Sequence, residues 1–237
     1  MNKDSLNKLK KYCLDCEIKI TDKQINCFDL YGDFLKDYNN KVNLTSIVDD
    51  DEIVKKHFLD SLIVEKYLDL NNKKIIDVGS GAGFPGAPIK IMNDSVNMTL
   101  MDSIGKKTKF LELLKEHLKI DLIILNKRAE DLGRDKKYRE QYDISLARAV
   151  KNLRVLSEYC LPLVKLGGYF VAMKGSQDNK QELDEARDII KTLGGEIKDI
   201  IDYKLAFEDE RKLILIKKIS QTPPRYPRLT AQILKKK

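Results

Sequence analysis

The stretch Ile75-Ile76-Asp77-Val78-Gly79-Ser80-Gly81-Ala82-Gly83-Phe84-Pro85-Gly86 decides the fold of this chain. A short apolar run ends in an acid and is followed by four glycines within eight residues. This pattern is typical of a buried parallel strand that turns sharply into a loop lying against a ligand. Because a Cβ atom would obstruct both the turn and the close approach of the backbone, we expect ligand contacts at Gly79, Gly81 and Gly83.

A second acid follows at the spacing that a nucleoside requires. Asp102 closes the next apolar run, residues 96–101, and lies 23 residues after Gly79. An acid at the tip of the neighbouring strand is placed to accept hydrogen bonds from the two hydroxyls of a ribose. The glycine loop and Asp102 together predict a cofactor that contains a nucleoside.

The spacing of the glycines indicates which cofactor to expect. Dinucleotide-binding folds favour G-x-G-x-x-G, whereas this loop reads G-x-G-x-G and continues with Phe-Pro-Gly. A carboxylate at Asp77, at the end of the strand, suits a cationic ligand better than a pyrophosphate. The sulfonium and the α-amino group of S-adenosylmethionine meet that requirement, so we expect a methyltransferase-type site and disfavour a dinucleotide oxidoreductase.

The 237 residues are enough for one substantial core with a small appendage. We expect an N-terminal helical extension over 1–72, an α/β domain over 73–219 and a basic, proline-containing tail over 220–237.

Strands and helices alternate after residue 73, which predicts a mostly parallel seven-stranded sheet with helices on both faces. The last two strands follow the last helix, so we expect an antiparallel pair at one edge. The predicted strands are 74–78, 97–101, 121–125, 142–146, 168–173, 197–205 and 211–218. The predicted helices between and after them are 86–92, 104–118, 152–165 and 179–193.

Three helices are expected before the sheet begins. The first runs from about Ser5 to Glu17, and the second begins at a capping box formed by Thr21 and Gln24. A third helix is expected to end near Leu68. The pair Cys13-x-x-Cys16 lies in an apolar stripe at helical spacing and has no second pair, so we expect buried cysteines and no metal site.

The net charge of +7 is concentrated in the tail. Residues 217–237 contain seven basic residues and no acid, so the rest of the chain is electrically balanced. Prolines are expected to keep this tail extended, and Tyr226 lies between Arg225 and Arg228. An aromatic residue interleaved with arginines favours a polyanion contact, and RNA in particular, over a solvated end with no partner.

No apolar run approaches the roughly 18 residues that cross a membrane, and the first residues contain no signal-peptide core. We expect a cytoplasmic protein without a membrane partner, and a monomer.

Ligands of an open α/β sheet bind beyond the carboxyl ends of the strands, so the residues there are the candidates for chemistry. Glu130 is expected near the exocyclic amine of an adenine, with a backbone N–H of that turn near the ring nitrogen. Phe84 packs either on the cofactor or in the core. Arg148 and Lys174 are two cations that we expect at the same edge of the site. They would suit an RNA phosphate or the O6 and N7 acceptors of guanine. The remaining candidates are Ser103, Arg128, Ala129, Asp131, Lys151 and Ser176.

The candidates include no evident general base, and guanine N7 would not need one. N7 carries a lone pair and no proton, so alignment with the sulfonium methyl and exclusion of water would be enough. The strand-four tip lacks the Asn/Asp-Pro-Pro-aromatic string of exocyclic-amine methyltransferases. Cys160 falls in a predicted helix, which disfavours a cytosine-C5 thiolate mechanism.

Several strings in this order resemble one family, the bacterial 16S rRNA (guanine-N7)-methyltransferases RsmG, also called glucose-inhibited division protein B. They are Asn43-Leu44-Thr45, His57-Phe58-Leu59-Asp60-Ser61-Leu62, the glycine loop, Asp102-Ser103, Arg128-Ala129-Glu130, Ala147-Arg148-Ala149, Met173-Lys174-Gly175 and Tyr226-Pro227-Arg228. The resemblance covers nearly the whole chain. Relatives usually continue with a glycine and a proline after the last string, where this chain has Leu229-Thr230-Ala231 and ends in three lysines.

The resemblance implies a Rossmann-like class I methyltransferase that uses S-adenosylmethionine to modify guanine 527 in the 530 loop of 16S rRNA in the small ribosomal subunit. It implies that the RNA side is faced by His57, Arg148 and Lys174, with a purely structural histidine as the alternative for His57. The implied cofactor contacts are Gly79, Phe84, Asp102, Ala129, Glu130 and Arg148. A small-molecule methyltransferase and a non-catalytic RNA-binding protein with a nucleoside pocket remain the alternatives.

Overall fold

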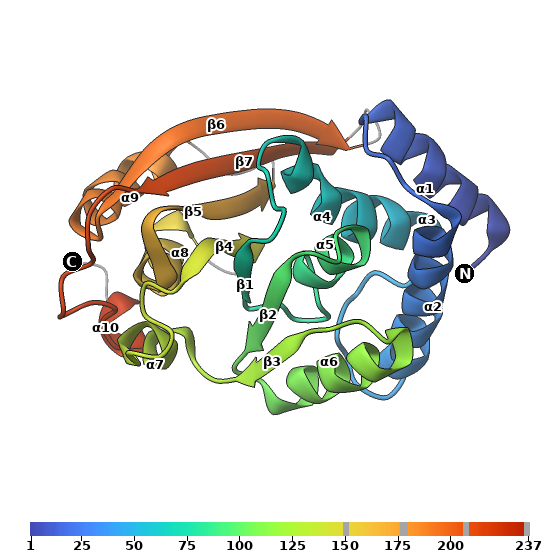
Figure 1. Ribbon diagram of the computed structural model, residues 1–237, viewed down its shortest axis with the longest axis horizontal. Coiled ribbons are helices and arrows are strands. Elements are labelled where there is room, and N and C mark those ends of the chain that lie inside the picture. The colour runs from blue at the N-terminus through green and yellow to red at the C-terminus, as the bar shows by residue number, and fades with distance from the viewer. Residues whose placement is uncertain (149–151, 176–179, 206–208, 235–237) are drawn as a thin grey trace.

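The computed structural model describes residues 1–148, 152–175, 180–205 and 209–234. Its centre is a seven-stranded sheet in the order β3-β2-β1-β4-β5-β7-β6 (Figure 1). Neighbouring strands from β3 to β5 run parallel, whereas β7 is antiparallel to both β5 and β6. The mostly parallel sheet and the antiparallel pair at one edge are therefore confirmed.

The strands lie close to their predicted positions. They are β1 (Lys74–Val78), β2 (Asn97–Asp102), β3 (Ile123–Asn126), β4 (Tyr142–Arg148), β5 (Val164–Gly175), β6 (Gly195–Leu205) and β7 (Asp209–Lys218). The main differences are the later start of β3 and the greater length of β5. Since β5 pairs with β4 on one side and with β7 on the other, hydrogen bonds from both neighbours extend it beyond its apolar run.

The N-terminal extension is helical as expected. Its first two helices are α1 (Lys3–Asp15) and α2 (Asp22–Asn39), and the capping box of α2 is present, with Thr21 N donating to Gln24 Oε1 at 2.8 Å. The predicted third helix is wrong as a single α-helix. It consists of α3 (Asp50–Glu52), the π-helix η1 (Ile53–Leu59), α4 (Asp60–Leu62) and the 3₁₀ helix η2 (Ile63–Lys66).

The helices that follow the strands are α5 (Gly86–Met92), α6 (Gly105–Leu118), α7 (Ala129–Arg134), α8 (Leu153–Cys160), the 3₁₀ helix η3 (Leu161–Leu163) and α9 (Lys180–Thr192). The α-helical part of α8 stops earlier than predicted, because Pro162 has no N–H to continue it. Neither α7 nor the short tail helix α10 (Thr230–Ile233) was predicted.

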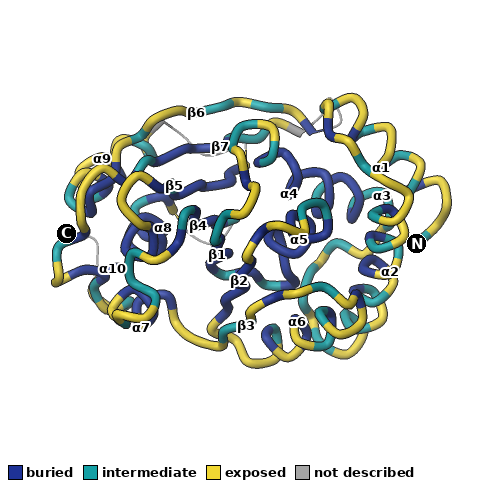
Figure 2. Tube along the Cα trace, in the orientation of Figure 1, coloured by how far each residue is buried: buried dark blue, intermediate teal, exposed yellow. Residues whose placement is uncertain are grey.

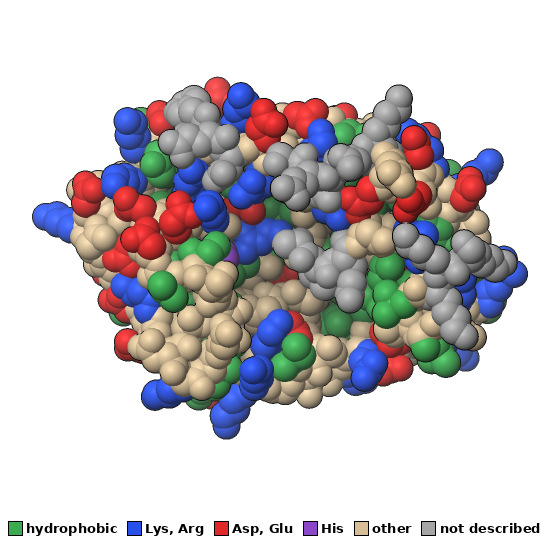
Figure 3. All heavy atoms as spheres, turned by 180° about the vertical axis from the view of Figure 1, so that it is seen from behind, with side chains coloured by type: hydrophobic (Ala, Val, Ile, Leu, Met, Phe, Trp, Pro, Cys, Tyr) green, Lys and Arg blue, Asp and Glu red, His purple; other side chains and the backbone are tan. Residues whose placement is uncertain are grey.

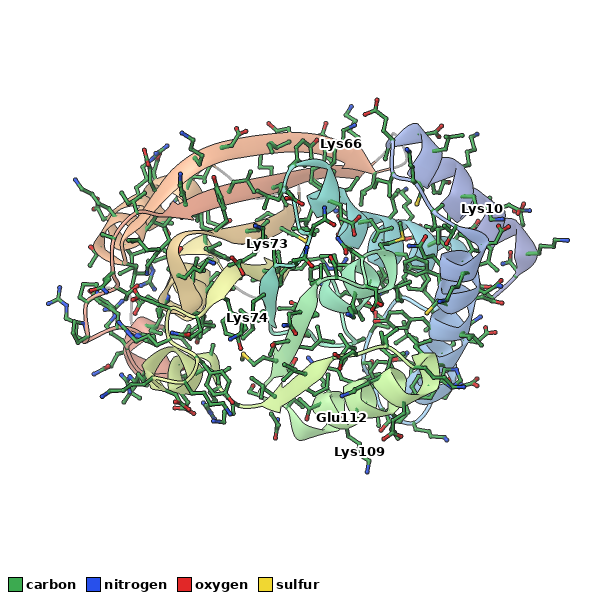
Figure 4. All side chains as sticks on the ribbon, viewed as in Figure 1. Lys10, Lys66, Lys73, Lys74, Lys109 and Glu112 are labelled. Carbon is green, nitrogen blue, oxygen red and sulfur yellow. The ribbon has the colours of Figure 1, made fainter. Side chains whose placement is uncertain are left out.

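Two apolar layers enclose the sheet, which appears as a buried centre surrounded by exposed helix faces (Figure 2). Ile75 belongs to the layer formed with α1, α2, α5 and α6, and Ile76 belongs to the layer formed with α7, α8 and α9. Alternate residues of a strand point to opposite faces, which explains why the consecutive residues Ile75 and Ile76 are both apolar. On α6, Phe110 is fully buried, whereas Lys109 and Glu112 lie on its outer side (Figure 4).

The N-terminal helices share the first of these layers with the sheet. Leu9, Cys13, Phe28 and Leu35 are fully buried in it together with side chains of β1, β2 and α6. The burial of Cys13 raises the pKa of its thiol to about 12, as expected of a small core residue. Among the described residues, no group of three His, Cys, Asp or Glu side chains is placed to hold a metal ion.

The C-terminal tail is folded against the domain, so the expectation that prolines keep it extended is wrong for the described part. The guanidinium of Arg139 donates hydrogen bonds to the backbone carbonyls of Thr222, Pro223 and Tyr226, and the Tyr226 side chain is buried. Two of the tail cations within the described residues have internal partners. Lys218 is fully buried and donates to three oxygens, and Arg228 forms an ion pair with Glu158.

No helix within the described ranges is both long enough and apolar enough to cross a membrane.

Candidate functional site

A cavity of about 500 Å³ lies beyond the carboxyl ends of β1, β2 and β4. This is the point where the strand order reverses direction, which is where open α/β sheets bind ligands. The face of the molecule seen in Figure 3 is hollowed near its centre, with basic and histidine side chains in the hollow. The cavity is lined by Val78, Gly79, Met101, Asp102, Ser103, Ile104, Lys107, Arg128, Ala129, Glu130, Arg148, Leu156, Tyr159 and Thr230.

The glycine loop has the backbone that its sequence predicts. Gly79, Gly81 and Gly83 all have positive φ, at 78°, 59° and 98°, where side chains are strained. A Cβ on Gly83 would lie only 2.6 Å from the hydroxyl oxygen of Tyr31. That hydroxyl donates to the carbonyl of Ala82 at 2.5 Å, so α2 of the N-terminal extension holds the loop directly. Only Gly79 of the three glycines lines the cavity.

Asp77 is fully buried behind the loop and does not line the cavity. Its Oδ2 accepts a hydrogen bond from Gly86 N at 2.9 Å, and its Oδ1 has no partner among the described residues. Burial raises the pKa of Asp77 to about 7, although the Gly86 hydrogen bond and Arg148 act in the opposite direction. In this structure Asp77 therefore organises the loop and retains one unused acceptor next to it.

Asp102 lines the cavity with a carboxylate held by backbone groups. Gly81 N donates to its Oδ2 at 3.1 Å and Ile104 N to its Oδ1 at 2.9 Å, and Lys107 Nζ lies 3.7 Å from Oδ2. These contacts join the tip of β2 to the glycine loop, so the two features that predicted a nucleoside lie side by side.

Ala129 and Glu130 reach the cavity from the first turn of α7, and both are buried. Glu130 Oε1 accepts a hydrogen bond from the hydroxyl of Thr230 in the tail at 2.5 Å. Arg128 Nη1 lies 3.8 Å from the same oxygen, and its side chain is largely exposed.

Arg148 ends β4 and is held by the N-terminal extension. Its Nη1 donates to the carbonyl of Lys56 at 3.0 Å and to Asp60 Oδ2 at 3.1 Å. Its guanidinium carbon lies 5.2 Å from the centre of the Phe84 ring, within the range of a cation–π contact. The π-helix η1 supplies the carbonyl, and π-helices are often found at functional sites. Arg148 thus faces both the cavity and the extension.

His57 and Phe84 form one stack at the same place. Their ring centres are 4.4 Å apart at 15°, and Tyr31 stacks on Phe84 at 5.2 Å. Burial and the neighbouring Arg148 lower the pKa of His57 to about 3. Since Arg148 Nη2 approaches Nδ1 at 3.3 Å and can only donate, Nδ1 is the acceptor and Nε2–H donates to Thr45 Oγ1 at 3.0 Å. Phe84 thus packs in an aromatic cluster and does not line the cavity.

Lys174 is not part of the cavity wall. Its side chain is only 6% exposed and its Nζ lies 2.7 Å from Glu182 Oε1 on α9. The structure therefore does not bring Lys174 together with Asp102 and Glu130. The candidates Lys151 and Ser176 lie outside the described residues.

Several cavity residues were not found by sequence reasoning, namely Ile104, Lys107, Leu156, Tyr159 and Thr230. Ile104 and Lys107 could have been found, because they follow Asp102 closely in the sequence. Tyr159 lies inside α8 and Thr230 lies in the tail, so nothing in the local sequence connects either with the site. Asp60, the partner of Arg148, could have been suspected because it lies one helical turn after His57.

Solved structures of low sequence identity share this fold. A ribosomal protein L11 methylase from Lactobacillus delbrueckii subsp. bulgaricus matches with a TM-score of 0.53 at 12% identity, covering 70% of this chain and 79% of that one. An S-adenosylmethionine-dependent O-methyltransferase from Thermotoga maritima matches with a TM-score of 0.50 at 15% identity, covering 80% of this chain and 72% of that one. Both confirm the Rossmann-like class I architecture.

Relatives at higher identity carry one name, Ribosomal RNA small subunit methyltransferase G. The relative from Acetivibrio thermocellus is 48% identical over 213 residues, which is 89% of this chain and 87% of the relative. The relative from Clostridium kluyveri is 47% identical over 220 residues, which is 91% of each chain. The family described as rRNA small subunit methyltransferase G (GidB) matches residues 24–213. The chain, with its glycine loop, its Asp102 and its Arg148 gathered at one end of the sheet, belongs to that family.

Proposed function

We propose that this protein transfers a methyl group from S-adenosylmethionine to N7 of a guanine in 16S rRNA, at position 527 of the 530 loop. The observation that carries the proposal is the convergence of Asp102, Glu130 and Arg148, from three strand ends, on one cavity. Family membership supports the ribosomal RNA of the small subunit as the substrate.

The residues present fit S-adenosylmethionine. Asp102 offers two carboxylate oxygens at the position where a ribose presents its hydroxyls, and Glu130 offers an acceptor for the adenine amine. Asp77 has a buried oxygen without a partner among the described residues, next to the loop. A cationic group of the ligand near that loop would favour the charged form of this carboxyl, whose pKa lies near 7 because of burial. Arg148 offers a guanidinium that suits a carboxylate or the edge of a guanine.

The mechanism requires little of the protein beyond positioning. When bound, S-adenosylmethionine supplies an electrophilic methyl group on a sulfonium. Guanine N7 attacks with a lone pair and loses no proton, so no side chain has to act as a base. His57, whose pKa is about 3, is neutral at physiological pH and does not serve as a general acid there. The His57, Phe84 and Arg148 cluster instead orients the guanidinium and keeps water from that end of the cavity.

We propose that Lys174, which lies at the carboxyl end of β5, faces the RNA. In this structure its Nζ is paired with Glu182 Oε1. We also propose that the protein acts as a monomer in the cytoplasm, and that 1–72, 73–219 and 220–237 are its functional parts.

The test is transfer of radiolabelled methyl from S-adenosylmethionine to small-subunit RNA and to small-subunit particles, followed by nucleoside analysis. We expect label in 7-methylguanosine at one position. The variant Glu130→Gln should lose cofactor affinity and activity, whereas Glu196→Gln on the exposed side of β6 should keep both.

Each other outcome has a defined meaning. Label in another nucleoside would keep the cofactor and reject the N7 mechanism. Binding of RNA with no label on either substrate, and with cofactor bound, would favour the non-catalytic RNA-binding alternative. Label on a small molecule only would favour the small-molecule methyltransferase.

A further inference from the structure

The described part of the tail is anchored along its length to the wall of the cavity. Arg139 donates to the carbonyls of Thr222 and Tyr226, and Arg134 Nε donates to the carbonyl of Pro227 at 2.9 Å. A Cβ on Gly133 would lie 2.8 Å from Pro227 Cγ, so the tail packs directly on the backbone of α7. Gly133 and Arg134 belong to α7, the helix that carries Ala129 and Glu130, and Arg139 follows that helix.

A second set of anchors joins the tail to α8. The guanidinium of Arg228 contacts both carboxylate oxygens of Glu158, which is itself fully buried. Arg154 Nη2 donates to the carbonyl of Ile233 at 2.7 Å, and the Ile233 side chain is fully buried. The segment 226–233 is therefore anchored to the domain both before α10, at Arg228, and at the last residue of α10, Ile233.

Thr230 is the residue of this segment that lines the cavity. Its hydroxyl donates to Glu130 Oε1 at 2.5 Å and lies 3.1 Å from the hydroxyl of Tyr159. A threonine hydroxyl has one proton. Because that proton goes to Glu130, Tyr159 must be the donor to Thr230. The three side chains form a chain of hydrogen bonds directed at Glu130, and all three line the cavity.

The direction of this chain determines what Glu130 can still do. Oε1 accepts from Thr230, and within the described residues no hydrogen bond reaches Oε2. The oxygen left for a ligand is therefore an acceptor. A ligand group that donates, such as an amine, satisfies it, and a group without a donor leaves it unpaired at a cost in binding.

We propose that the segment 226–233 is a wall of the cofactor cavity, and that Thr230 is a positioning residue which holds Glu130 as the acceptor for the exocyclic amine of the cofactor's adenine. The inference rests on the proposed use of S-adenosylmethionine. It gives the tail a role in selecting a ligand that carries the adenine amine, in addition to any contact that its exposed cations make with RNA.

The test compares the affinities of the intact protein for two ligands by calorimetry. One is S-adenosylhomocysteine, and the other is its analogue with hydrogen in place of the adenine amine. The wild type should prefer the amine about tenfold or more, the range expected for a hydrogen bond to a charged group. Thr230→Val keeps the shape and removes the donor, so it should reduce that preference at least about threefold. Thr230→Ser should keep it, and so should the matched control Thr192→Val, whose hydroxyl binds Asp188 O on α9.

The preference, a ratio of two affinities, separates positioning from general damage. If Thr230→Val weakens both ligands equally, Thr230 is only structural and the inference is overturned. If Glu130→Gln lowers the preference and Thr230→Val leaves it unchanged, Glu130 reads the amine without help from the tail, and again only the inference fails. If the wild type binds neither ligand, or Glu130→Gln leaves the preference unchanged, the cofactor assignment itself fails at this position.

Discussion

Arg148 Nη1 lies 3.1 Å from Asp60 Oδ2, which joins the tip of β4 to the N-terminal extension across 88 residues of sequence. The other oxygen of Asp60 accepts a hydrogen bond from the hydroxyl of Tyr203 on β6 at 2.9 Å. Asp60 is only 6% exposed. One buried carboxylate thus ties the extension, the site and the antiparallel edge of the sheet together.

Asp60→Asn should lower the free energy of unfolding by about 2 kcal/mol, because it leaves the half-buried Arg148 without its counter-charge. It should also weaken binding of S-adenosylhomocysteine, because Arg148 faces the cavity. Urea unfolding and calorimetry measure the two effects. Tyr203→Phe is the matched control at the other oxygen and should cost about 1 kcal/mol with little loss of affinity. Equal affinities for wild type and Asp60→Asn would show that Arg148 needs no support from the extension.

Asp77→Asn should stabilise the ligand-free protein at pH 8. The pKa of Asp77 is raised from 3.8 to about 7, so the folded state holds the proton more tightly than the unfolded state. The free energy of unfolding therefore falls as the pH rises from about 4 to about 7, and the penalty is fully present above that range. Urea unfolding should show the variant a few (~2–4) kcal/mol more stable at pH 8 and similar to wild type at pH 4. The same variant should bind S-adenosylhomocysteine less tightly, and unchanged affinity would separate Asp77 from the ligand.

His57 should make the protein sensitive to acid. Its pKa falls from 6.5 to about 3 on folding, so the unfolded chain takes up a proton that the folded chain rejects. The free energy of unfolding should therefore decrease by up to about 1.4 kcal/mol for each pH unit from about pH 6.5 down to about pH 3, with no further change outside that range. In His57→Gln this part of the slope should be missing, although the lost stacking on Phe84 lowers stability at every pH. His117→Gln, at the other histidine, is the matched control. Identical slopes for wild type and His57→Gln would contradict the prediction.

Arg225 and Arg228 should differ in their contributions to RNA binding. Arg225 is exposed, with its guanidinium carbon 5.2 Å from the Tyr226 ring, whereas Arg228 is paired with Glu158. Arg225→Gln should reduce the slope of log affinity against log salt by about 0.7 for single-stranded RNA, without loss of stability. Arg228→Gln should lower the free energy of unfolding by about 3 kcal/mol, because it leaves the buried Glu158 unpaired. Binding titrations at several salt concentrations decide this, and an unchanged slope in Arg225→Gln would remove Arg225 from the RNA contact.

The sequence by itself determined the features that depend on neighbouring residues. The apolar run before Asp77, the glycines after it and the acid at Asp102 predicted the strand, the loop and the adjacent strand tip, because backbone sterics and strand polarity act over a few residues. The alternation of strands and helices determined the sheet and its antiparallel edge. The capping box at Thr21 followed from two side chains three positions apart. The sequence did not predict the π-helix at Ile53–Leu59, because the pattern of that segment is the pattern of an ordinary α-helix.

Only the tertiary structure decided which distant side chains complete the site. Thr230 meets Glu130 across 100 residues, and Asp60 meets Arg148 across 88. Thr230 carries no local signal, and the position of Asp60 one helical turn after His57 does not identify Arg148 as its partner, because a hydroxyl or a carboxylate is equally compatible with solvent until packing buries it. The same reason explains Lys174 and the tail. Their charges suggested contacts with RNA, but burial made a nearby carboxylate the partner of Lys174 and of Arg228, since a buried charge without a partner is costly.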